Sequence, residues 1–223
     1  RAAERDGYIM RCEADGSGVM MIVTPGGTFT PKQLKIDEQA GKLYWADREG
    51  MAIQRCNLDG THIETLVTTG SAKFNAGDQT RWCVGIALDP ARGHIYWSQK
   101  GGDNAGQGVI RRADMQMPPG STPTNRRDMV TLFSRLAEPI DLDLDLKTRT
   151  LYWSDRGDNT ISRAPMDPAA GFSPATRLDR QVLVTGLKEA IGVNIRDYLV
   201  KPVTPRQVLT VVTRILEGPL IRS

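Results

Sequence analysis

The chain has 223 residues, enough for one large domain with a buried core, because single domains run to about 100–200 residues. Hydrophobic residues make up 39% and charged residues 25%, which excludes wholesale disorder and a fibrous chain. The formal net charge of +3 predicts no nucleic-acid partner, and no apolar run approaches the roughly 18 residues of a membrane-spanning helix. Three cysteines and the lack of a signal-peptide pattern at the start favour a reduced, cytoplasmic setting.

Three segments share one pattern: a strand that ends in Asp, a turn, and an aromatic strand with adjacent Tyr and Trp. Two further strands follow each Tyr–Trp pair, and Asp59–Gly60 suits the positive φ of a tight turn between them. Four short antiparallel strands per repeat are typical of a β-propeller blade, so the sequence predicts three complete blades. The repeated aromatic and acidic residues are Tyr44, Trp45, Asp47, Tyr96, Trp97, Tyr152, Trp153 and Asp155.

Both ends of the repeat region predict partial blades. Residues 8–16 match residues 52–60 with an offset of 44, so the N-terminus is interpreted as the tail of an earlier blade. Residues 189–195 predict the opening strand of a further blade that has no Tyr–Trp strand. If the N-terminal strands add to this opening strand, the ring closes with four blades. If they do not, an open fan exposes apolar blade faces, which predicts a protein partner or self-association.

The motifs YWAD, YWSQ and YWSD, with RCNLDG after the first, resemble the YWTD repeats of low-density-lipoprotein-receptor-type six-bladed β-propellers, also called class B repeats. The resemblance covers about residues 7–195. It implies that the Tyr, Trp and Asp of each motif are structural, and that ligands dock on one face near the central channel. It therefore implies a binding scaffold rather than an enzyme. Only three of the expected blades are complete, and the cysteine-rich modules of extracellular receptors are absent from this sequence.

The last residues differ in character and predict a strand, a loop and a helix, with Thr204 as the N-cap of an apolar-periodic segment. The segment DYLVKP resembles the last strand and the Lys-Pro element, Lys201 and Pro202, of a two-component response-regulator receiver domain. In receivers this Lys contacts a phosphoryl group, but the acidic pocket is missing here, so no phosphoacceptor activity is expected. The predicted division is an all-β, incomplete propeller over residues 1–195 and a receiver-like strand-helix tail over residues 196–223.

Polar residues recur at equivalent positions of the opening strands, namely Lys35, Asp141, Asp143 and Asn194. If these strands line the channel, Asp141, Asp143 and Asn194 could hold a divalent cation such as calcium through oxygen ligands, as in gluconolactonase-like propeller hydrolases. The alternative is a wet channel lined by solvated polar groups, because carboxylates alone seldom specify a metal. We favour the second interpretation and expect no cofactor.

Trp82 is a separate candidate because it precedes an opening strand where the other repeats carry Pro31 and Glu138–Pro139. It is either an exposed contact on the ligand face or a packing residue. Three functions remain open: a non-enzymatic interaction scaffold, a metal-dependent propeller hydrolase, and a phosphorelay role through the tail. The first is favoured, because every strong motif is structural and no catalytic residue set is visible.

Overall fold

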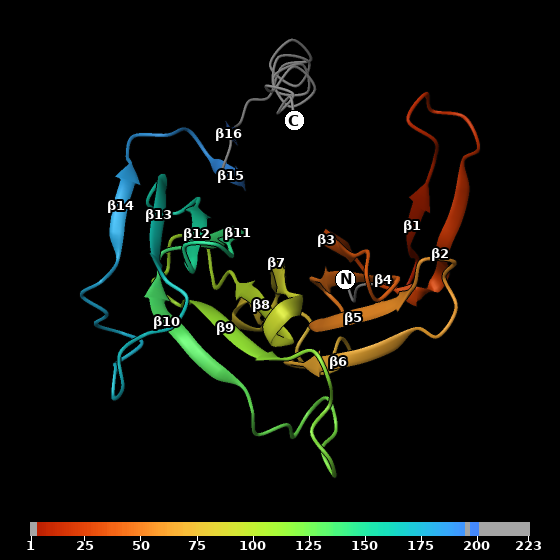
Figure 1. The fold of residues 1–223 in the computed structure, drawn as a ribbon, viewed down its shortest axis with the longest axis horizontal. Coiled ribbons are helices and arrows are strands. Elements are labelled where there is room, and N and C mark those ends of the chain that lie inside the picture. The colour runs from red at the N-terminus through yellow and green to blue at the C-terminus, as the bar shows by residue number, and fades with distance from the viewer. Residues whose placement is uncertain (1–3, 195–196, 201–223) are drawn as a thin grey trace.

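The computed structural model describes residues 4–194 and 197–200, and these residues fold almost entirely into antiparallel strands. Three four-stranded sheets stand in a row like the blades of a fan, and a two-stranded sheet stands at each end of the row (Figure 1). The helices in the described ranges are two three-residue 3-10 helices, and no helix there has the length and apolar character needed to cross a membrane. The predicted all-β fold with three complete blades is confirmed.

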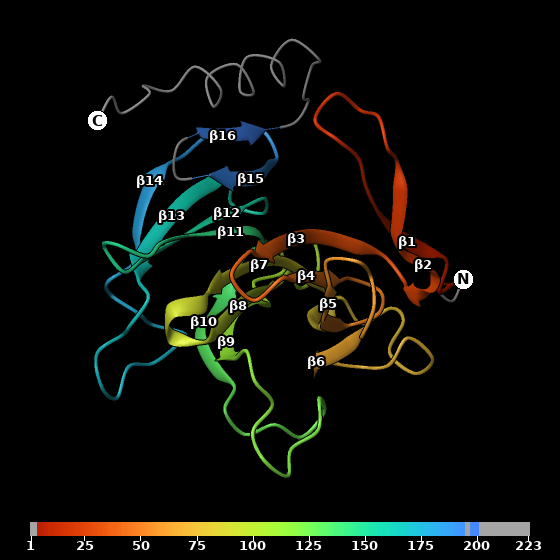
Figure 2. The same ribbon diagram turned by 45° about the vertical axis from the view of Figure 1, so that its right-hand side comes forward.

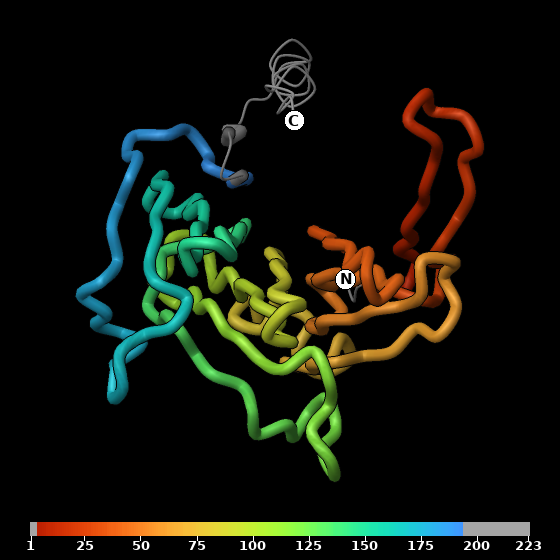
Figure 3. The backbone as a smooth tube through the Cα atoms, viewed as in Figure 1, coloured from red at the N-terminus to blue at the C-terminus, as the bar shows by residue number. Residues whose placement is uncertain are grey.

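Each complete blade is an antiparallel meander whose first strand lies nearest the centre of the fan (Figure 3). The first blade comprises β3 (Pro31–Asp37), β4 (Lys42–Asp47), β5 (Ala52–Asn57) and β6 (Glu64–Thr68). The second comprises β7 (Cys83–Asp89), β8 (His94–Gln99), β9 (Gly108–Asp114) and β10 (Val130–Leu136), with η1 (Gln79–Arg81) and η2 (Pro90–Arg92) on either side of β7. The third comprises β11 (Pro139–Asp145), β12 (Thr150–Asp155), β13 (Thr160–Pro165) and β14 (Gln181–Val184).

The repeated Trp residues lie on the second strand of each blade and are fully buried. Trp97 belongs to one apolar cluster with Ile53 of the first blade, and Trp153 belongs to another with Leu132 of the second blade. The hydrophobic core is therefore divided among the joints between neighbouring blades. Each blade buries its motif Trp against the blade before it, and Tyr44 and Tyr96 lie in the clusters shared with the blade after, so the repeat needs neighbours to be stable.

The N-terminal pair comprises β1 (Gly7–Arg11) and β2 (Met20–Thr28). Its approach to the first blade depends on Gly60, whose φ is 85°. A Cβ at this position would lie 1.9 Å from the backbone oxygen of Ile22 in β2. Only glycine avoids both the clash and the strain of this left-handed conformation. The Asp-Gly turn expected from the sequence therefore also lets β2 pack closely on the first blade.

The C-terminal pair comprises β15 (Ala190–Asn194) and β16 (Asp197–Val200), and it forms a sheet separate from the N-terminal pair. Figure 2 shows the two pairs at opposite ends of the row. Of the two alternatives left open by the sequence, a single chain therefore forms the open fan and not the four-bladed ring. Each pair packs on the complete blade next to it, through Ile9 at one end and Val193 at the other, and the turn from blade to blade leaves the pairs apart.

The opening strand predicted at residues 189–195 is present as β15, and the strand predicted at the start of the tail is present as β16. Its pairing with β15 was not predicted, because the sequence analysis placed it in a separate receiver-like tail. Backbone positions Val193 and Tyr198 pair across β15 and β16, so residues 197–200 take the place of the missing Tyr–Trp strand. This pairing joins residues on both sides of the predicted boundary between residues 195 and 196. The division of the chain into a propeller and a tail stays a prediction. Lys201, Pro202 and the predicted C-terminal helix lie outside the described residues.

Candidate ligand-binding face

The start of each blade is held by the last residue of the aromatic motif. In the first blade, the Asp47 carboxylate accepts hydrogen bonds from the Thr28 hydroxyl at 2.7 Å and from the Thr30 backbone N–H at 2.8 Å. In the third blade, Asp155 Oδ1 accepts one from the Glu138 backbone N–H at 2.8 Å. Burial raises the pKa of Asp155 to about 6. These bonds position the segments that enter the innermost strands.

The second blade achieves the same connection with Gln99 in place of Asp. The Gln99 side-chain amide donates to the Thr80 backbone oxygen at 2.6 Å, which fixes η1 just before β7. Trp82 follows η1 directly, and two cations lie close to its ring. The Arg48 guanidinium lies 5.0 Å and the Lys100 ammonium 5.7 Å from the ring centre. Both lie within the distance at which a ring face attracts a cation, so Trp82 anchors these two side chains.

A network of four charged side chains joins the second and third blades beside Trp82. Glu138 is only 2% exposed, and its Oε1 accepts hydrogen bonds from Lys100 at 2.7 Å and from Arg156 at 2.5 Å. Asp103 accepts from the same two cations at 2.8 and 3.2 Å. The hydrogen bond from Lys100 lowers the pKa of the exposed Asp103 carboxyl. Glu138 is thus a buried charge with two cationic partners, as a buried carboxylate requires.

These groups surround a cavity of about 380 Å³ on the face of the fan where the innermost strands begin. Val84, Ile140 and Ile191 supply apolar walls from the second blade, the third blade and the C-terminal pair. Arg48 is also paired with Glu49 outside the lining, and the charged residues that line the cavity are four basic and two acidic. They are Lys32, Arg48, Lys100, Arg156, Asp103 and Glu138. A pocket with apolar walls and a few convergent polar groups is the usual form of a ligand site.

Sequence reasoning identified Trp82 on this face but missed the cations around it. Arg48, Lys100 and Arg156 directly follow the aromatic motif in the first, second and third repeat. This shared position in the repeat was the sequence signal that could have identified the three cations. The turn after the second strand of each blade opens on the cavity, so one repeat position delivers three cations to one place.

The residues predicted to line the channel form a second, separate group. Lys35 lies 3.8 Å from Asp143 Oδ1, so β3 and β11 do bring these side chains together. Asp141 instead points toward the C-terminal pair, where its Oδ2 accepts a hydrogen bond from the Val193 backbone N–H at 2.9 Å. Burial raises the pKa of Asp141 to about 6. Asn194 lies on β15 beside Val193, and its side chain is outside the described residues.

The arrangement of these carboxylates suits structural hydrogen bonding better than cation binding. Asp141 Oδ1 accepts a hydrogen bond from the Leu142 backbone N–H at 2.8 Å, so both of its oxygens are occupied by backbone donors. The Lys35 ammonium stands beside Asp143, where it would repel a divalent cation. Among the described residues, no group of three or more His, Cys, Asp or Glu side chains is placed to hold a metal ion.

Comparison with known proteins finds relatives in fungi and in the mouse. The chain is 41% identical over 201 residues to a 3-hydroxyacyl-CoA dehydrogenase-like protein LAM1 from Cochliobolus heterostrophus, spanning 86% of this chain and 42% of the relative. It is 40% identical over 195 residues to a low-density lipoprotein receptor-related protein 1 from Pyricularia oryzae, spanning 83% of this chain and 62% of the relative. It is 36% identical over 196 residues to low-density lipoprotein receptor-related protein 5 from Mus musculus, spanning 87% of this chain and 10% of the relative.

The fold has a counterpart among solved structures. A chain of a nidogen/laminin complex superposes with a TM-score of 0.59 at 23% identity, covering 82% of this chain and 59% of that one. No protein-family model matches. The chain spans less than two thirds of each of these relatives. The comparisons lend no support to the receiver-like tail. With the three complete blades, they support an incomplete β-propeller of the YWTD type, similar to those of receptor-related proteins.

Proposed function

We propose that this chain is a non-enzymatic binding scaffold that takes an acidic segment of a protein partner on the face where the innermost strands begin. The observation that carries the proposal is the cavity of about 380 Å³ beside Trp82, with four basic and two acidic side chains in its lining. Arg and Trp are the residue types that most often dominate protein interfaces. Carboxylate groups of a partner would find charge-assisted hydrogen-bond donors there.

The rigidity of the cations supports this function. Lys100 and Arg156 are held by the buried Glu138 and by Asp103, so their positions are set before a partner arrives. Preorganised side chains lose less conformational entropy on binding, which favours affinity. The likeness to a chain of the nidogen/laminin complex agrees with a role in protein interaction, although that likeness concerns the fold alone.

No observation in the described residues favours the two alternative functions. The hydrolase requires a cation among Asp141, Asp143 and Asn194, and Asp141 already accepts two backbone hydrogen bonds. The phosphorelay role rests on Lys201, which lies outside those residues. The dehydrogenase-like name belongs to a relative of which this chain spans 42%. The described residues contain no strand–helix–strand unit of the kind that binds dinucleotides.

The experiment is a selection of peptides from a randomised library on the full chain, followed by titration of the selected peptides. We expect carboxylate-rich peptides whose affinity falls as salt rises, because exposed ion pairs are screened. Trp82→Ala should weaken binding roughly thirtyfold, as hot-spot aromatics contribute about 2 kcal/mol or more. Arg48→Gln should weaken it by a smaller factor.

Lys147→Gln is the matched control, since it removes the same charge from an exposed turn after β11. The proposal fails if the selected peptides carry no excess of carboxylates. It also fails if Trp82→Ala, shown by urea denaturation to be folded, binds them as tightly as the unaltered chain does.

A further inference from the structure

The first blade has an uncovered inner half. Leu34 and Ile36 on β3 are 45% and 52% exposed, whereas Ile86 on β7 and Leu142 on β11, which stand at the position of Leu34, are 0% exposed. The difference follows from the strands that the N-terminal pair provides. Residues 8–16 match residues 52–60, so β1 and β2 correspond to the third and fourth strands of a blade. No described strand stands in place of the first and second strands that would cover Leu34 and Ile36.

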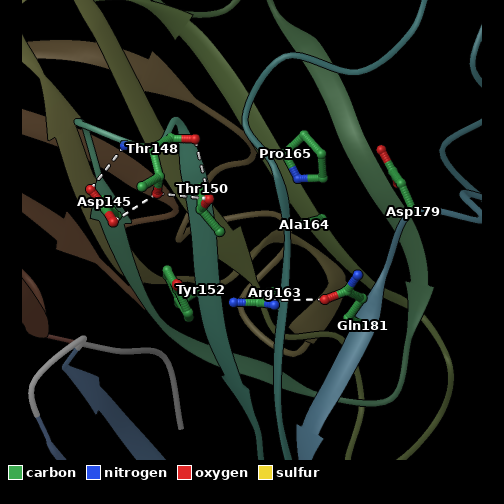
Figure 4. Close-up of a pocket in the computed structure, with 9 residues that line it drawn as sticks. All are labelled: Asp145, Thr148, Thr150, Tyr152, Arg163, Ala164, Pro165, Asp179 and Gln181. Atoms are coloured by element: carbon green, nitrogen blue, oxygen red, sulfur yellow. Dashed lines mark hydrogen bonds between the residues drawn. The ribbon is translucent and has the colours of Figure 1, made fainter.

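The third blade has the opposite deficiency. β15 and β16 correspond to the first and second strands of a blade, and they cover only the inner half of its face, where Val193 joins a cluster with Ile161. The outer half forms an open hollow of about 440 Å³ lined by Tyr152, Arg163 and Gln181 (Figure 4). No described strand covers this hollow in place of a third and fourth strand. Within the part of the chain that the structure describes, each end of the fan therefore has the half-blade that the other end lacks.

The complete joints show what a covering blade provides. One Arg stands opposite the motif Tyr in the third strand of every complete blade, at Arg55, Arg112 and Arg163. Arg55 Nη2 donates to Gln116 Oε1 of the second blade at 3.4 Å. Arg112 Nη1 lies 3.2 Å from Asp167 Oδ1 of the third blade. Gln116 and Asp167 follow the third strands of their blades by the same two residues, so both joints use one repeat position as the acceptor.

The N-terminal pair carries an acceptor at this same position. Asp59 is the equivalent residue of the first blade, and the offset of 44 places Asp15 there in the N-terminal pair. Asp15 is exposed, in the turn after β1. Arg163 is also exposed and donates to Gln181 of its own blade at 2.9 Å. Asp15 and Arg163 therefore offer opposite charges at equivalent positions of a joint.

We infer that this chain associates head to tail with a second copy of itself, the N-terminal pair of one copy completing the blade that β15 and β16 begin in the other. In this composite blade Asp15 of the first copy pairs with Arg163 of the second copy. The strands β15 and β16 of the second copy cover Leu34 and Ile36 of the first copy. Within one chain the two pairs form separate sheets that do not pair with each other. Two copies joined at both ends have six complete and two composite blades, eight in all, within the range of about 4–8 blades known for propellers. The contact is heterologous, since different surfaces of the two copies meet.

The test is the molar mass of the full chain by light scattering over a concentration series, for the unaltered chain and for the exposed charge reversals Asp15→Arg and Arg163→Asp. The unaltered chain should rise to at least twice the mass of one chain. Each reversal places like charges across the contact and should stay at the mass of one chain. An equimolar mixture of the two variants, and the double variant Asp15→Arg/Arg163→Asp, restore opposite charges and should regain the higher mass.

The rescue separates a broken contact from a broken fold, because a misfolded variant would not be restored by its partner. The inference is overturned if the unaltered chain keeps the mass of one chain at every concentration. It is also overturned if the two single variants associate as the unaltered chain does, or if neither the mixture nor the double variant regains the higher mass.

Discussion

The joints between complete blades and the two ends of the fan are built from the same repeat, yet they differ in what they bury. Leu142, inside a joint, is fully buried, and its equivalent Leu34, at the end, is 45% exposed. The sequence pattern around the two residues is nearly the same. The comparison shows that the repeat specifies one half of a joint, and that burial depends on which strands stand next to it.

The largest expected effect concerns a Trp at the centre of a joint. Trp97→Ala removes a fully buried indole from the cluster that links the first and second blades, and should lower the free energy of unfolding by about 3–5 kcal/mol. Tyr8→Ala, at a 52% exposed residue of the N-terminal pair, should change it by no more than about 0.5 kcal/mol. Urea denaturation measures both, and equal losses would show that the end of the fan is as tightly packed as the joint.

A matched pair of leucines sharpens the comparison. Leu142→Ala should cost about 2–5 kcal/mol, because it leaves a cavity in a joint. Leu34→Ala, the same change at the equivalent half-exposed position, should cost less than about 1 kcal/mol. The measurement is the urea midpoint at low protein concentration, with the slope as a check that the transition is unchanged. If Leu34→Ala cost as much as Leu142→Ala, the claim that its end is uncovered would be wrong.

The pKa of Asp155 makes part of the joint stability depend on pH. Because the pKa of Asp155 in the folded state is about 6, above the ordinary value of 3.8, the folded protein holds this proton more tightly than the unfolded chain does. The stabilisation is fully present below about pH 3.8 and is lost as pH rises through 6, by at most about 3 kcal/mol. Asp155→Asn should remove this loss, since Oδ1 accepts the hydrogen bond from Glu138 while Oδ2 has no partner among the described residues.

The check is the free energy of unfolding of both proteins between pH 4 and 7. The variant should match the unaltered chain near pH 4 and equal or exceed it near pH 7. A variant that is less stable at pH 7 than at pH 4, to the same degree as the unaltered chain, would assign the pH dependence to other groups.

Asp47 occupies the equivalent position in the first blade, and the same substitution should act differently there. Both of its oxygens accept hydrogen bonds, from Thr28 at one oxygen and from the backbone of Thr30 at the other. Asp47→Asn replaces one acceptor by a donor and should cost about 1.5–3 kcal/mol. The measurement is the urea midpoint at pH 7. A cost no larger than that of Asp155→Asn would contradict the different roles assigned to the two carboxylates.

Much of the fold could be predicted from the sequence because the repeat carries it. The spacing of Tyr44, Tyr96 and Tyr152 defined the second strand of each blade, and the Asp-Gly turn at residues 59–60 was found at the end of a third strand. The separation of the two ends could not be predicted, because it depends on the turn accumulated from blade to blade rather than on any local pattern. The strand at residues 197–200 was predicted, but its pairing with β15 was missed because these residues lack the Tyr–Trp motif.

The candidate site was predictable only in part. Trp82 stood out because it departs from the repeat pattern. Lys100 and Arg156 were overlooked because they occupy a regular position of that pattern. Their importance depends on Glu138, a residue of a neighbouring segment that buries its charge between them. Asp141 was expected to face the channel, and its contact with Val193 of the C-terminal pair depends on how that pair packs. Such contacts between repeats leave no mark in the sequence of one repeat.

Backbone hydrogen exchange, followed strand by strand at low protein concentration, tests the contrast between joints and ends most directly. The account predicts that β7 and β8, which lie between complete blades, exchange only when the whole chain unfolds, and that β1, β3 and β15 exchange faster through local opening. Equal protection of β3 and β7 would contradict it, because the end of the fan would then be as well covered as the joints.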